Sequence, residues 1–251
     1  AFVQMLESQA LDPDAVARLR TIMAREGTDE ATLMQHDVQA PLRWFRDLYP
    51  DLDVDRATLL GFSFAGQAQL TSFGPLSVPL VSAGSVAEIV ELLTYLPLIT
   101  TAINAQFRPN DQGLTVGLWG HTGDRALDCL AVTYTGSALL RLLDMLVSDA
   151  LTVTLHLSWS APVSLNKLAA EMVLAGRLFF DAPMSYLHVP VNALNEVCRF
   201  SDPLAYRLAV AELRRTLDEQ SGATSFSKKV RRLLDEDPGQ RSCQRVADEL
   251  S

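Results

Sequence analysis

The spacing of apolar residues changes along the chain, and this change limits the folds that the chain can adopt. Up to residue 99, apolar positions recur every three to four residues, which predicts helices. After residue 100, short segments alternate between apolar and polar positions instead. The clearest is residues 151–158, where aliphatic side chains alternate with two threonines and a histidine, which predicts a strand.

The order of these segments excludes a doubly wound sheet, because helices and strands do not alternate regularly. We expect strands at residues 101–108, 114–120, 151–158, 177–180 and 185–189. Helices are expected between several of them, and a long helix begins at Asp202-Pro203 and runs through Leu217. The chain is therefore predicted to be α+β: a helical N-terminal part, then a small antiparallel β-barrel or sheet with packed helices.

The composition indicates a protein with a large core and no membrane-spanning segment. Of the 251 residues, 48% are hydrophobic, enough to bury a core of one large or two small domains. The most apolar long segment, residues 86–100, contains Glu88, Glu91 and Pro97 and so is expected to be a buried helix. No signal peptide pattern is present.

The three cysteines favour a reducing compartment. Cys129, Cys198 and Cys243 are widely separated and form no C-x-x-C pair, which argues against a disulfide scaffold or a zinc site. We therefore expect a cytoplasmic protein without a metal or other cofactor.

The last 28 residues resemble the first half of a helix-turn-helix. Ser225 or Ser227 can cap a basic helix, which Pro238-Gly239 ends. Ser242 can cap a second short helix, with Val246, Ala247 and Leu250 as its buried stripe. A linker at residues 221–222 is expected to separate this tail from the body, although an ordinary solvated helix pair has the same spacing.

Charge also distinguishes the tail from the body. The tail holds six of the 21 basic residues and five of the 30 acidic ones, so residues 1–223 hold 15 basic and 25 acidic. An acidic body joined to a locally basic terminus is typical of a sensor domain attached to a DNA-contacting domain. In that case Lys228, Lys229, Arg231 and Arg232 would at most contact phosphates.

The segment Val230–Ser251 resembles the start of the DNA-binding domain of AraC/XylS-type transcription regulators, with Val246, Ala247 and Leu250 at matching positions. The body resembles the arabinose-binding-like effector domain of the ornithine-utilisation and mycobacterial-virulence branch of that family. The similar segments, in order, are residues 73–79, 84–95, 159–162, 176–183 and 187–190, followed by Leu194 and Asp202-Pro203.

The resemblance implies a bacterial, cytoplasmic, ligand-responsive regulator that is not an enzyme. Residues 1–220 would bind an effector and form a homodimer, and residues 221–251 would be the linker and the start of an incomplete helix-turn-helix domain. Double-stranded DNA would be contacted mostly by helices beyond Ser251. The effector could be amino acid-like or fatty acid-like.

Side chains for the effector pocket are expected among aromatic residues and histidines of the strands. A pocket of this kind is mostly apolar with a few converging polar groups. The candidates are Phe107, Trp119, His121, Tyr134, His156 and Trp159. The apolar faces of residues 139–146 and of the helix with Leu204, Leu208, Ala211, Leu213 and Leu217 are candidates for dimerisation, or for packing on the body.

Two other classes of function stay open in the sequence. Residues 57–66 resemble the nucleophile elbow of serine hydrolases, with Gly61 two residues before Ser63, which would be the nucleophile. A cupin-like barrel could bring together three of the four histidines, but no H-x-H or H-x-x-E cluster supports a metal site. The histidines are His36, His121, His156 and His188. A ligand-binding module without a role on DNA is the third possibility.

Overall fold

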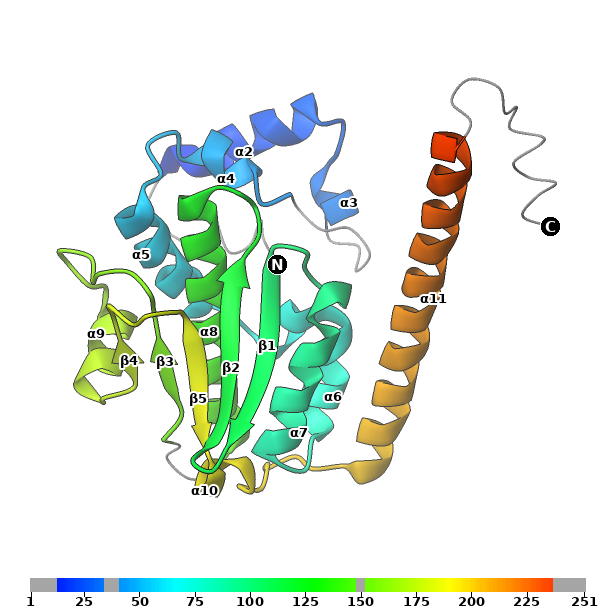
Figure 1. Ribbon diagram of the computed structural model, residues 1–251. Helices are drawn as coiled ribbons and strands as arrows, with labels where there is room; N and C mark the ends of the chain where they lie inside the picture. The colour runs from blue at the N-terminus through cyan, green and yellow to red at the C-terminus, as the bar shows by residue number, and fades with distance from the viewer. Residues whose placement is uncertain (1–12, 34–40, 148–151, 237–251) are drawn as a thin grey trace.

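Five strands form one open sheet in the order β1-β2-β5-β3-β4, with helices packed around it (Figure 1). The computed structural model describes residues 13–33, 41–147 and 152–236. The strands are β1 (Ile103–Asn110), β2 (Gly113–Gly120), β3 (Thr154–His156), β4 (Leu178–Phe179) and β5 (Tyr186–Pro190). Only the β3–β4 pair is parallel, so the predicted α+β class is confirmed. The predicted barrel or sheet takes the form of an open sheet.

Helix α8 (Arg125–Leu146) forms the centre of the core behind this sheet. Asp124 caps its first turn by accepting hydrogen bonds from the backbone amides of Ala126 and Leu127. A Cβ at Gly136 would lie 2.6 Å from a methyl group of Leu155, so this glycine allows close approach of α8 to β3.

The same helix shows why hydropathy alone is a poor guide here. Among the described residues, α8 is the one helix whose length and apolar composition would allow a membrane span, although residues 86–100 had been expected as the most apolar segment. Most of its apolar window is buried inside the protein, as in a core helix. The face Leu139–Leu146 packs in the core, so of its two expected roles, dimerisation or packing on the body, it has the second.

The N-terminal part is helical, as predicted, and covers one end of the core. It consists of α2 (Pro13–Arg25), α3 (Glu30–Leu33), α4 (Trp44–Leu48) and α5 (Val54–Ala65). Helix α5 packs along α8. A Cβ at Gly61 would lie 2.7 Å from Cβ of Thr133, so Gly61 sits where the two helices approach most closely.

Short helices connect α5 to the sheet, and two more follow β3 and β5. They are η1 (Leu70–Leu76), α6 (Ser77–Ser82), α7 (Val86–Glu91) and η2 (Leu92–Leu98), and later α9 (Lys167–Leu174) and α10 (Val191–Leu194). The Oγ of Ser85 caps α7 by accepting a hydrogen bond from the backbone amide of Glu88, and the carboxylate of Glu88 accepts one from the backbone amide of Gly84.

The last helix is longer than predicted. Helix α11 is one continuous helix from Pro203 to Glu236, so the expected break at Ser221-Gly222 is not present. It packs on α6 and η2 near its beginning and extends away from the body toward its end (Figure 1). The predicted second helix of the tail, including Ser242 and Val246, lies outside the described residues.

Candidate functional site

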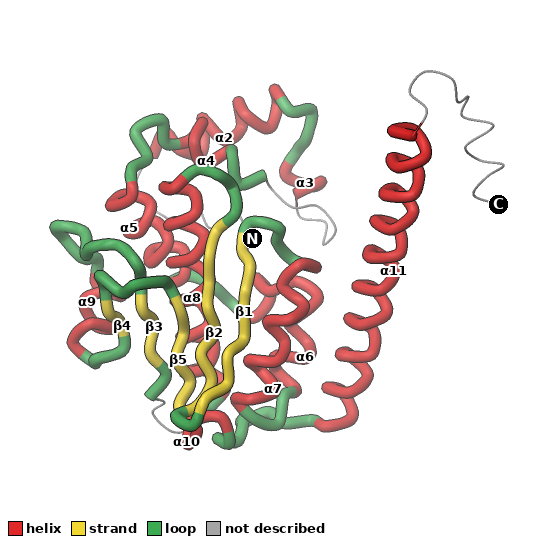
Figure 2. Tube along the Cα trace, in the orientation of Figure 1, coloured by secondary structure: helices red, strands yellow, loops and turns green. Residues whose placement is uncertain are grey.

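The sheet has a covered face and an open face, and the open face carries the aromatic side chains. Leu155, Leu187 and Val116 point toward the helices and are fully buried. Alternate residues of the same strands point the other way. Figure 2 shows that no described element crosses in front of β1, β2 and β5 on that side. We call this side the outer face.

Three rings stack side by side on the outer face. The imidazole of His156 on β3 lies between the rings of Phe179 on β4 and Tyr186 on β5, at centroid distances of 4.7 and 4.3 Å. The interplanar angles are 14° and 8°, so the rings are nearly parallel. The strand register explains this arrangement, because His156 pairs directly with both residues.

Burial and a neighbouring histidine favour the neutral form of His156. Burial lowers its pKa from 6.5, and the nearby His188 lowers it further. The Oγ1 of Thr154 and Nε2 of His156 form a hydrogen bond of 3.0 Å. The outer face therefore presents a neutral, hydrogen-bonded aromatic row at neutral pH.

The six residues predicted for an effector pocket do not gather at one place. Trp119 and His156 lie on the outer face. Phe107 lies on the covered face, half-buried against the core, and His121 is exposed just after β2. The remaining two, Tyr134 of α8 and Trp159, pack against helix α5 or the residues after it.

Burial raises the pKa of Tyr134, whose half-buried ring lies near Ala65, Ala68 and Ala138. Trp159 is buried, and its indole Nε1 donates a 2.8 Å hydrogen bond to Oγ1 of Thr58. Both side chains pack within the body, so Trp119 and His156 are the two predicted pocket residues that lie on the outer face.

Sequence reasoning missed Phe179, Met184 and Tyr186, which share the outer face with Trp119 and His156. A signal was present in the alternation of Tyr186 and His188 with Leu187 and Val189. This alternation shows that Tyr186 and His188 share one face of their strand, but it does not show which strands lie next to that strand.

The nucleophile-elbow interpretation of Ser63 is wrong in its local structure. Ser63 lies inside α5, with helix on both sides, whereas an elbow requires a sharp turn between a strand and a helix. Its Oγ accepts a 3.1 Å hydrogen bond from Nδ2 of Asn166. Gly61, the other residue of the apparent motif, is explained by the contact between α5 and α8.

The histidines do not form a cluster with metal-ligand geometry in the part of the chain that the structure describes. His156 and His188 project from neighbouring strands, and His121 lies beyond the end of β2. Within residues 13–33, 41–147 and 152–236, no three His, Cys, Asp or Glu side chains are grouped to hold an ion. His36 lies outside these ranges.

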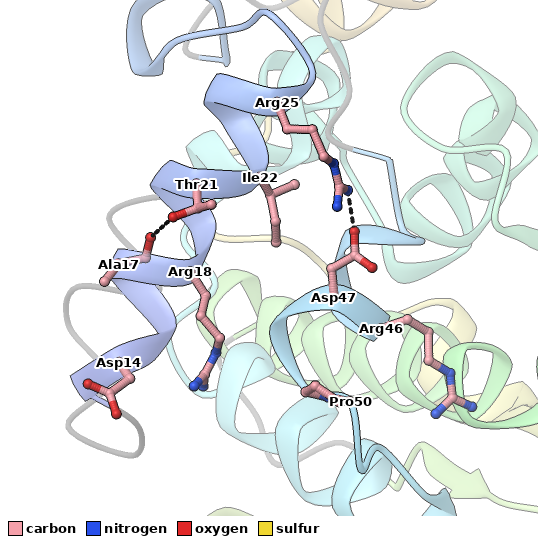
Figure 3. A pocket seen from close by; sticks show the side chains of 9 residues that line it. All are labelled: Asp14, Ala17, Arg18, Thr21, Ile22, Arg25, Arg46, Asp47 and Pro50. Atoms are coloured by element: carbon pink, nitrogen blue, oxygen red, sulfur yellow. Dashed lines mark hydrogen bonds and ion pairs between the residues drawn. The ribbon is translucent and has the colours of Figure 1, made fainter.

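A hollow of about 660 Å³ lies between α2 and α4 (Figure 3). Two of the arginines that line it, Arg25 and Arg46, are engaged in ion pairs. Arg25 pairs with Asp47, and the Nη2 of Arg46 lies 2.7 Å from Oδ1 of Asp124. The Arg46 pair holds the pKa of Asp124 below its ordinary value. These pairs join the N-terminal helices to the start of α8.

The basic residues predicted to touch DNA phosphates lie on α11. The backbone at Lys228, Lys229, Arg231 and Arg232 is helical. Their side chains lie outside what the structure describes, so contact with DNA stays a prediction.

Comparison with known proteins identifies the fold. No protein family model and no curated protein matches the chain. Among solved structures, the transcriptional regulator CdpR from Pseudomonas aeruginosa matches with a TM-score of 0.52 and 17% sequence identity. The match covers 81% of this chain and 63% of the CdpR chain. The chain has a fold found in a transcriptional regulator.

Proposed function

We propose that this chain is the sensing and dimerising part of a ligand-responsive, DNA-binding transcription regulator of the AraC/XylS type. The observation that carries the proposal is the fold shared with CdpR across 81% of the chain. In this proposal the protein is cytoplasmic and has no enzymatic role.

The segments that resemble the family support the proposal by their place in the fold. Residues 84–95 build α7 and the start of η2, and Asp202-Pro203 begins α11. Helix α11 then connects the body to the basic segment without interruption up to Glu236. The base-contacting helices would, by the same resemblance, follow Ser251.

The outer face of the sheet is the surface that supports sensing best. It combines exposed aromatic rings with polar groups, among them Gln106, whose Oε1 accepts a 3.0 Å hydrogen bond from Nη2 of Arg108. Aromatic rings beside a few polar groups are the chemistry that binds small organic ligands. Trp119 and Phe179 are 42% and 43% exposed, although large aromatic side chains are usually buried. In this proposal the effector binds there and changes the population of DNA-binding states.

Helix α11 supports the proposed homodimer. Its inner face packs on the body through Tyr206, Val210 and Leu213, and Nε of Arg214 donates a 3.0 Å hydrogen bond to Oη of Tyr95. The opposite face exposes Leu204 and Leu208, which are 61% and 64% exposed. Apolar side chains four residues apart on an uncovered helix face are typical of a helix–helix interface. We propose that a second copy of the chain covers them.

The DNA-binding role is tested by selecting binding sites from a random pool of double-stranded DNA with the purified, intact gene product. We expect enrichment of one motif with two half-sites, because a dimer with paired helix-turn-helix units reads repeated sequence. A pool that stays random after repeated rounds, with folded protein at low salt, would contradict the proposal.

A further inference from the structure

The row of side chains across the outer face is interrupted at Gly117. The strand register aligns Gln106, Gly117, Tyr186, His156 and Phe179 across the whole sheet, one residue from each strand. The last three carry the stacked rings. Gly117 has no side chain, so the row of rings stops beside β2.

The geometry of the row leaves one face of Tyr186 turned toward this position. His156 lies against the other face of the Tyr186 ring at an angle of 8°. Neighbouring strands lie about 4.8 Å apart, and the rings of this row are 4.3 and 4.7 Å apart. A flat ring above Gly117 would therefore lie at stacking distance from Tyr186.

Two partly exposed side chains border the position. Cε of Met184 and Cζ3 of Trp119 lie 3.0 and 3.7 Å from where a Cβ of Gly117 would be. Met184 is 39% exposed and reaches over Gly117 from the segment before β5. A methionine side chain is flexible and can move aside, whereas Trp119 offers a second aromatic surface.

We propose that the position above Gly117 binds a flat, neutral aromatic or heteroaromatic small molecule, which displaces the Met184 methyl group and continues the ring row. Tyr186 stacks on the ligand ring, Trp119 covers its side, and the amide of Gln106 is the next group in the row. Offset parallel stacking of this kind is favourable for aromatic pairs.

Charge favours a small neutral ligand over single-stranded nucleic acid, which also stacks on sheet aromatics. The chain has a formal net charge of −9, and the positive side chain that the register places beside the row is Arg108, which donates a hydrogen bond to Gln106. Binding of a phosphate backbone requires a surface with several positive side chains. The role of this ligand as an effector rests on the proposed function, whereas its binding to the sheet can be measured without DNA.

The test uses naphthalene-2-carboxamide as the probe and its saturated analogue, decahydronaphthalene-2-carboxamide, as the control ligand. Binding is followed through tryptophan fluorescence and by ligand titration in two-dimensional NMR. Quenching reports mainly on Trp119, because Trp44 and Trp159 are only 2% and 8% exposed. We expect the flat probe to bind at least tenfold more tightly than the saturated one.

Two variants locate the site. Gly117→Val fills the position, and the atom it meets first is the mobile end of Met184, so the strand can retain its fold. We expect at least a tenfold loss of probe binding, whereas Thr115→Val on the same face of β2 keeps it. Met184→Ala opens the position, and we expect it to increase the affinity severalfold.

Three results would overturn the inference: equal binding of the flat and saturated probes, equal binding by the Gly117→Val variant, or no binding even by the Met184→Ala variant. Binding of a labelled oligothymidylate in place of the probe would do so as well. None of these results affects site selection on double-stranded DNA, so failure of this inference is distinguishable from failure of the proposed function.

Discussion

Hydrogen bonds from individual polar side chains link the segment after β3 to helix α5. Trp159 donates to Thr58, whose own Oγ1 donates a 2.7 Å hydrogen bond to the carbonyl of Val54. Asn166 caps α9 through its Oδ1 and reaches Ser63 through its Nδ2. The sequence made Trp159 a candidate for ligand binding and Ser63 a candidate for catalysis, whereas these contacts explain both side chains as structural.

Thr58→Val tests the structural role of this buried pair. The substitution keeps the shape and leaves the indole N–H of Trp159 buried without its acceptor. We expect the free energy of unfolding to fall by roughly 1–3 kcal/mol, as for an unsatisfied buried donor. Urea denaturation measures this change, with Thr216→Val on α11 as the control because its hydrogen bond is exposed. A decrease in the free energy of unfolding of less than about 0.5 kcal/mol would contradict a buried hydrogen bond between Trp159 and Thr58.

The stacked His156 makes stability depend on pH. Its pKa in the folded protein is below the ordinary value of 6.5, so the unfolded chain takes up the proton first as the pH falls. The contribution of His156 is therefore fully present above pH 6.5 and is lost as the pH falls toward the folded pKa.

We expect the native protein to lose more stability between pH 7.5 and pH 5 than the His156→Gln variant does. Urea denaturation at the two pH values measures the difference. An equal loss in both proteins would show that His156 does not titrate differently on folding.

At the scale of elements, the tight contact between α5 and α8 depends on a residue without a side chain. Gly61 faces Thr133 with no room for a Cβ. The backbone carbonyl of Leu130 would also lie 3.0 Å from that Cβ, so the helices would have to separate. A glycine inside a helix costs some stability relative to alanine, and here close packing offsets that cost.

Gly61→Ala is expected to destabilise the protein by about 1–3 kcal/mol, because the added methyl group forces α5 away from α8. The same substitution at Gly222 in α11 is the matched control, and it is expected to stabilise its helix by about 0.5–1 kcal/mol. Thermal and urea denaturation compare the two. Stabilisation by Gly61→Ala would show that α5 and α8 leave room for a methyl group at this position.

The local pattern of apolar residues predicts where strands lie along the chain, but it does not predict which strands lie side by side. The strands at 103–110, 113–120 and 186–190 lie where alternation predicted them. The pairing of β5 with both β2 and β3 is a long-range property, so the ring row could not be predicted. The break predicted at Ser221-Gly222 is absent because a single glycine lowers helix stability by only about 1 kcal/mol, and helical sequence continues on both sides.

At the scale of the whole molecule, the exposed apolar face of α11 determines the expected assembly. Leu204 and Leu208 lie opposite the face that packs on the body, and Phe200 just before the helix is 57% exposed. Burial of such side chains against a second chain would remove apolar surface from water. The assembly would then place two α11 helices side by side.

Replacing Leu204 and Leu208 together with lysine is expected to convert a dimer into a monomer, because two charges would face the partner helix. Sedimentation velocity measures the mass over a range of concentrations. Leu174→Lys is the control that should leave the dimer intact, because the Leu174 side chain is exposed at the end of α9. A native protein with the mass of one chain at high concentration would exclude this interface.

The central claim is that this chain belongs to a regulator that occupies DNA, and occupancy in the cell tests it most directly. Chromatin immunoprecipitation of the tagged, intact gene product measures where it binds along the genome. We predict narrow peaks upstream of a small set of genes, with lower occupancy when Lys228, Lys229, Arg231 and Arg232 are replaced with alanine, because phosphate contacts are lost. A profile identical to that of the untagged strain, with the protein present at normal level, would contradict the claim.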